Sequence, residues 1–140
     1  MPVIFPFEKI PSDIFGEIRR PYATVFLRKK DKSGWVDARM VVDTGADYTL
    51  LPKMYARRLG IDVFTDCTVQ ETRGVGGTET IYLYRGLTAR IGDYEQTIPV
   101  GFLERSDVPP LLGRQEFLEI FRVVFEKHQV IFSKPRTRKS

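Results

Sequence analysis

The sequence predicts an all-β domain with two short helices, built as a closed or semi-closed β-barrel. Many short segments rich in β-branched and aromatic residues are separated by frequent turn motifs. Only two segments carry helix signals, and no internal repeat with a period of about 20–50 residues is present. The 140 residues, 42% of them hydrophobic, are enough for one core and too few for two comfortable domains.

Two strands are predicted in the first part of the chain. Residues 22–28 and 35–42 are rich in β-forming side chains, and the polar segment 29–34 between them is typical of a turn. Residues 1–20 contain three prolines and no clear periodicity. We therefore expect 1–20 to be an extended N-terminal arm, which either adds strands to a subunit interface or covers a binding cleft.

Two short helices are predicted at 52–59 and 114–120. Pro52 suits the first position of a helix, because its fixed φ angle is helical and its missing N–H group is not needed there. Gly60 then ends that helix. Between and after the helices, glycine-rich or polar turns indicate hairpins. The paired segments are 69–72 with 78–85, 87–91 with 96–102, and 122–125 with 129–132, the last turning at Lys127-His128.

The chain divides into an arm (1–20), a main domain (21–133) and a basic flexible tail (134–140). The four basic residues of the tail account for the whole net charge of +4, so residues 1–133 are neutral overall. A basic tail can contact nucleic acid weakly. It is more often a solvated terminus, and a neutral domain without a base-stacking motif argues against a nucleic-acid-binding barrel.

Composition also excludes several kinds of site. The single cysteine, Cys67, excludes an internal disulfide and a thiolate zinc site, and the single histidine, His128, excludes a histidine-rich metal centre. We expect no metal and no cofactor. No run approaches the roughly 18 apolar residues that span a membrane. The apolar start 1–7 is too short for a signal peptide and lacks a basic region before it, so we expect a cytoplasmic protein.

The segment most informative about chemistry is Asp43-Thr44-Gly45-Ala46-Asp47, which directly follows the predicted strand 35–42. Asp43 should therefore emerge on a loop at a strand end. Gly45 allows a tight turn and the close approach of a ligand or a second chain. Thr44 places a hydroxyl group beside the carboxylate.

This loop resembles the active-site loop of the retropepsin-like aspartic proteases, the retroviral protease group and its cellular relatives. Three further segments match in order and approximate spacing, from about residue 22 to 132. They are the glycine-rich segment 73–78 at the position of the family's flap, the apolar-apolar-Gly segment 111–113 followed by Arg114, and the short helix after it. The resemblance implies a retropepsin-like barrel with one lobe per chain, completed by homodimerisation.

The resemblance also implies an aspartic endopeptidase that cleaves extended peptide or protein substrates. Two facing carboxylates share one proton, because like charges a few ångströms apart do not both ionise. The ionised carboxylate activates water and the protonated one polarises the scissile carbonyl. Since the chain has one Asp-Thr-Gly, the second carboxylate must come from Asp43 of a second copy, in a symmetric homodimer.

Roles for the neighbouring residues follow from the same resemblance. Thr44 would form a hydrogen bond across the dimer, and Gly45 would present its carbonyl to the substrate backbone. Asp47 would bind substrate main chain or pair with Arg114, for which a purely structural ion pair is an equal alternative. The flap tip over the substrate would be formed by Val75, Gly76 and Gly77, unless this segment is an ordinary exposed hairpin.

Ala46 occupies a position at which pepsin-type relatives usually carry a hydroxyl residue. A hydroxyl that donates to a carboxylate favours its ionised form. Without that donor, we expect activity at mildly acidic to near-neutral pH. A second functional class is also possible, in which a catalytically weak or inactive dimer of this fold binds peptides. The intact Asp-Thr-Gly-Ala-Asp motif favours the enzyme.

Overall fold

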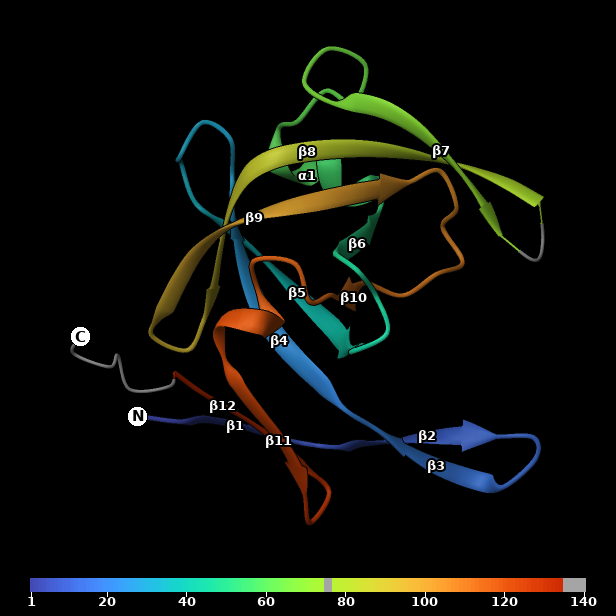
Figure 1. Ribbon diagram of the computed structural model, residues 1–140, viewed down its shortest axis with the longest axis vertical. Coiled ribbons are helices and arrows are strands. Elements are labelled where there is room, and N and C mark those ends of the chain that lie inside the picture. The colour runs from blue at the N-terminus through green and yellow to red at the C-terminus, as the bar shows by residue number, and fades with distance from the viewer. Residues whose placement is uncertain (75–76, 135–140) are drawn as a thin grey trace.

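The computed structural model describes residues 1–74 and 77–134 of the chain (Figure 1). This part is built mainly of β-strands, with one α-helix and one 3₁₀ turn. The elements are β1 (Val3–Pro6), β2 (Glu8–Ser12), β3 (Gly16–Arg20), β4 (Tyr22–Arg28), β5 (Trp35–Val42), β6 (Thr49–Pro52), α1 (Met54–Leu59), β7 (Thr68–Gly74), β8 (Gly77–Ile91), β9 (Tyr94–Leu103), β10 (Leu111–Leu112), η1 (Leu118–Ile120), β11 (Arg122–Glu126) and β12 (Gln129–Ser133).

Six strands close into a barrel, as the sequence predicts. One sheet has the order β4-β5-β10-β6-β9-β8-β7, and β4 also pairs with β8 to complete the ring. Alternate side chains fill the interior. Along β4, for example, Val25 and Leu27 are fully buried, while Phe26 between them is partly exposed. Outside the ring, β7 pairs only with the first part of β8.

The segments 78–85 and 87–91, which the sequence separates, are one strand in the structure. β8 runs for 15 residues, and its register with β9 shifts between Tyr84 and Leu87. Gly86 lies at this irregularity with φ of +92°, a backbone conformation that favours glycine. The irregularity bends β8 without ending it, so one strand serves both the β7–β8 hairpin and the barrel.

The first predicted helix begins two residues later than expected. Pro52 is the last residue of β6, where it lies opposite Leu103 of β9, and α1 starts at Met54. The predicted end is confirmed. Gly60 takes a left-handed conformation with φ of +73°, and the N–H groups of Gly60 and Ile61 donate to carbonyls of the last turn.

The second predicted helix, 114–120, is reduced to the 3₁₀ turn η1. Glu116 has φ of +56°, which interrupts a right-handed helix that starts at Arg114. Turn hydrogen bonds nevertheless organise the segment, with the N–H of Phe117 and of Glu119 both donating to the Arg114 carbonyl. The compact turn that follows β10 is therefore present, but it is not an α-helix.

Residues 1–20 contain three strands that the sequence pattern did not reveal. β1 joins β12 and β11 in a three-stranded sheet of order β1-β12-β11, while β2 and β3 form a separate hairpin (Figure 1). Prolines at positions 2, 6 and 11 obscured the alternation, in which Val3 and Phe5 pack against the core. The division of the chain at residues 20 and 133 stays a prediction, and residues 135–140 of the tail lie outside the described residues. In the described part of the chain, no helix is long and apolar enough to cross a membrane.

Candidate active site

The catalytic loop, residues 43–47, begins where two parallel strands end together. β5 pairs in parallel with β10, with Leu112 opposite Val42. The N–H of Asp43 donates to the Leu112 carbonyl at 3.0 Å, which continues the pairing by one residue. The backbone of Asp43 is thus held by the barrel, while its side chain is partly exposed.

Two hydrogen bonds between residues close in sequence form a turn immediately after Asp43. The Gly45 N–H donates to Asp43 Oδ1 at 2.9 Å, and the Ala46 N–H donates to the Asp43 carbonyl at 3.2 Å. A Cβ atom at Gly45 would lie 3.3 Å from Asp43 Oδ1, closer than ordinary contact. Thr44 and Gly45 are exposed. The turn therefore directs the carboxylate and its two neighbours toward solvent, where a second chain or a peptide can reach them.

Arg114 fixes the other end of the catalytic loop. Its Nη2 atom lies 2.6 Å from Asp47 Oδ1, so the contact predicted from the sequence is present. The backbone reinforces it, since the Arg114 N–H donates to the Ala46 carbonyl at 3.0 Å and the Gln115 N–H donates to the Asp47 carbonyl at 2.8 Å. The Asp47 side chain is still 81% exposed. It can hold the loop through Arg114 and present its free oxygen to a ligand.

Gly113 allows the two segments to approach this closely. A Cβ atom built there would lie 2.2 Å from the backbone carbon of Tyr48. The N–H of Gly113 donates to Thr49 Oγ1 at 3.2 Å, and Thr49 is fully buried. Thr49 carries no signal in the sequence, because a threonine at the start of an apolar run looks like an ordinary strand residue.

Tyr48 was also missed, although it follows Asp47 directly. A Cβ atom at Gly101 would lie 2.8 Å from the Tyr48 ring and from Ile81, and 2.9 Å from Leu50. These three side chains therefore meet over Gly101, beside the catalytic loop. Burial, and secondarily the charge of Asp47, raises the pKa of the Tyr48 hydroxyl. Tyr48 is thus a neutral, largely apolar neighbour of the carboxylates.

The β7–β8 hairpin lies where the resemblance places a flap, and Figure 1 shows it projecting from the barrel. Val75 and Gly76 lie outside the described residues. Gly77 starts β8 with φ of +114°. Near the tip of the hairpin, Glu79 lies opposite Thr72 and 4.0 Å from Arg105, which in turn lies 2.7 Å from Asp107. These contacts connect the hairpin to the loop that leads into β10.

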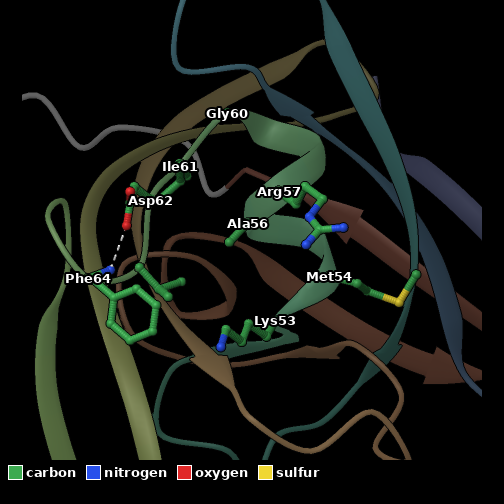
Figure 2. Close-up of a pocket in the computed structure, with 9 residues that line it drawn as sticks. Lys53, Met54, Ala56, Arg57, Gly60, Ile61, Asp62 and Phe64 are labelled. Atoms are coloured by element: carbon green, nitrogen blue, oxygen red, sulfur yellow. Dashed lines mark hydrogen bonds between the residues drawn. The ribbon is translucent and has the colours of Figure 1, made fainter.

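An open hollow of about 760 Å³ lies beside α1, and it shares no residue with the catalytic loop. Figure 2 shows Lys53 and Arg57 on one side of it and Phe64 on the other. Its acidic residue, Asp62, accepts hydrogen bonds from the N–H groups of Phe64 and Thr65 and so stabilises a turn. We place the candidate site at the catalytic loop, because there an acidic side chain lies in a strand-end turn that is open to a second chain.

Among residues 1–74 and 77–134, no group of three or more His, Cys, Asp or Glu side chains is arranged to hold a metal ion.

A barrel of this order, with an Asp-Thr-Gly turn held by an apolar-Gly-Arg segment, defines a retropepsin-like lobe. The family model for the gag-polyprotein putative aspartyl protease matches residues 34–119, which is more than half of the chain. The chain belongs to this family. No curated protein matches the sequence.

The fold comparison agrees with the family. The chain is similar to the crystal structure of a retropepsin-like aspartic protease from Rickettsia conorii, with a TM-score of 0.65 and 22% identity. The match covers 94% of this chain and 98% of that one. At this identity the likeness establishes the retropepsin-like fold, and the chemistry has to be argued from the residues themselves.

Proposed function

We propose that the protein is an aspartic endopeptidase that hydrolyses peptide bonds in extended polypeptides. In this proposal the catalytic dyad consists of Asp43 from each of two chains in a homodimer. The supporting observation is the difference between the two carboxylates of the catalytic loop. Asp47 is paired with Arg114 at 2.6 Å, whereas the Asp43 carboxylate accepts only the Gly45 N–H among the described residues.

A dyad at this position would divide the work between its two carboxylates. The ionised one takes a proton from water as the water oxygen attacks the carbonyl carbon, and the protonated one donates to the carbonyl oxygen. Collapse of the tetrahedral intermediate breaks the C–N bond. The leaving nitrogen takes up the proton that the first carboxylate had removed from water, and a hydroxyl proton of the intermediate returns to the second carboxylate. The two titrations belong to the pair and not to either aspartate.

The surrounding residues would bind the substrate as an added strand. The Gly45 carbonyl and the exposed side of Asp47 lie on the same loop as Asp43 and would contact the peptide backbone. Thr44 would hydrogen-bond to its partner across the two-fold axis. The hairpin segment Val75, Gly76 and Gly77 would close over the peptide and exclude water. The cytoplasmic location remains an expectation from the sequence.

The test is cleavage of an unbiased peptide mixture by the wild-type chain and by Asp43→Asn, from about pH 4 to 8. New termini produced by the wild type alone would support the aspartic mechanism and give its specificity. Equal cleavage by both would reveal a contaminating protease and contradict the proposal. A folded, dimeric wild type that binds peptides without cleaving them would favour the peptide-binding alternative.

A further inference from the structure

We infer that two copies of this chain associate through the free edge of β11, forming a continuous six-stranded sheet across the two-fold axis. The inference rests on the proposed function, because a chain with one catalytic aspartate needs a second copy. Its starting point is the three-stranded sheet β1-β12-β11, in which β12 is hydrogen-bonded on both sides within its own chain. Both edges of β12 are therefore already occupied.

Of the two outer strands, β1 is held against its own barrel at its start. The Tyr94 hydroxyl donates to the Met1 carbonyl at 2.9 Å, and Val3 lies against the β8–β9 turn, with its Cγ2 atom 2.3 Å from where a Cβ of Gly92 would be. The strand β11 is open to solvent along its length, since none of its five residues is buried and Phe125 is 44% exposed. An unpaired edge of this kind is a template for pairing with another chain.

The turn between β11 and β12 determines which groups of β11 face outward. Lys127 and His128 have φ of +50° and +58°, and Glu126 lies opposite Gln129, so the hairpin has a two-residue loop. The residues that flank such a loop form a hydrogen-bonded pair, and this pattern alternates along the strands. The N–H and C=O groups of Val123 and Phe125 therefore point away from β12, toward the free edge.

In one symmetric register of two antiparallel β11 strands, Val123 and Phe125 of both subunits form the backbone hydrogen bonds between the strands. In it, Val123 pairs with Phe125 of the partner subunit, and Val124 faces Val124 of the partner subunit at the two-fold axis. The same register places Arg122 opposite Glu126 of the partner subunit, twice. Among the described residues, neither Arg122 nor Glu126 has an ion-pair partner within the chain. If β11 of one subunit is shifted by one residue relative to β11 of the other, both charge pairs are lost.

The outer face of the sheet agrees with this register. Ile4, Ile131 and Val124 lie side by side across the three strands, and all three are at least partly exposed. Pairing at the Val124 axis would extend this apolar row across six strands. On the other face, the exposed Phe125 would pack against Val123 of the partner subunit, an aromatic to β-branched pair that stabilises sheets.

The register makes a covalent test possible. Facing residues at a non-hydrogen-bonded antiparallel position have Cα atoms about 4.5 Å apart, within the range that a disulfide spans. In a Cys67→Ser background, Val124→Cys should give a disulfide-linked dimer on mild oxidation. Ile4→Cys, in the same row but on the other outer strand, β1, is the matched control and should stay mostly uncrosslinked.

A charge exchange gives an independent test of the same register. Arg122→Glu and Glu126→Arg should each weaken dimerisation by about 10-fold or more, because like charges then face each other twice. The double variant should restore dimerisation to within a few-fold of the wild type. Sedimentation velocity measures association, and peptide cleavage is followed separately in every variant.

The outcomes separate this interface from the proposed function. Crosslinking at Val124 with rescue by the charge exchange supports the β11 edge, even if no peptide is cleaved. A dimer that cleaves peptides but shows neither crosslinking nor rescue overturns the β11 edge and leaves the protease intact. A wild type that is monomeric at all concentrations overturns both the interface and the two-chain dyad.

Discussion

The catalytic loop and the β7–β8 hairpin are both turns of the chain, but they are held very differently. The loop is bonded to the segment 112–115 by backbone groups of Asp43, Ala46 and Asp47, and Arg114 adds an ion pair. β7 pairs with β8 alone, and all its side chains from Thr68 to Arg73 are exposed. Groups that react need a fixed position, whereas a cover over a peptide has to open.

Gly113→Ala is expected to have the largest effect, because it disrupts the tight contact that holds the catalytic loop. The new Cβ atom would lie 2.2 Å from the Tyr48 backbone, which two paired segments cannot easily vacate. We expect a loss of about 3 kcal/mol in the free energy of unfolding, with loss of cleavage. Denaturant unfolding measures it. Gly34→Ala is the control, because no atom lies within 4 Å of its Cβ position, and a similar loss there would refute the steric argument.

Arg114→Ala separates positioning from stability. The ion pair with Asp47 is well exposed, so we expect a change below about 1 kcal/mol in the free energy of unfolding. Cleavage should fall by about 10-fold, because Asp47 and the loop lose their alignment. Comparison of kcat/KM with the unfolding midpoint tests this. Arg39→Ala, which removes the exposed pair with Glu8, should leave cleavage unchanged. Equal effects of the two variants would contradict a positioning role for Arg114.

Gly77→Ala changes the backbone conformation that is favourable at the start of β8 without introducing a steric clash. Gly77 has φ of +114° and no atom within 4 Å of its Cβ position, so the cost is backbone strain of about 1 kcal/mol. We expect faster amide hydrogen exchange in residues 68–83 and a several-fold fall in kcat/KM. Gly16→Ala, at another left-handed turn position with φ of +75°, is the matched control. Unchanged cleavage in Gly77→Ala would argue against a flap.

Ala46→Ser is expected to have the smallest effect. A serine hydroxyl beside Asp43 can donate to the ionised carboxylate and favour that form. The acidic side of the pH–activity profile should therefore move down by about half a pH unit, with little change in stability. Ala46→Gly is the control for the loss of the methyl group. An unchanged profile would show that the serine hydroxyl does not reach the dyad, and a shift toward higher pH would contradict its role as a donor to the ionised form.

Local chain chemistry determined much of this protein. Alternation and turn residues predicted β4 and β5 with their observed bounds, and Gly60 as the helix end, because these depend on neighbours in sequence. The same holds for the Asp-Thr-Gly turn, since Gly45 and Asp43 bond to each other two residues apart. The pairing of Asp47 with Arg114 was inferred through a family resemblance, since 67 residues separate them.

Tertiary structure decided what depends on distant segments. It extended β8 across Gly86, stopped a helix at Glu116 and turned Pro52 into a strand end, each against the local preference. It also incorporated β1 into a sheet with β12, which local proline signals had hidden. Local propensities are small, and hydrogen bonding between distant strands outweighs them. The free edge of β11 follows from that pairing, so no reading of residues 122–126 alone could have found it.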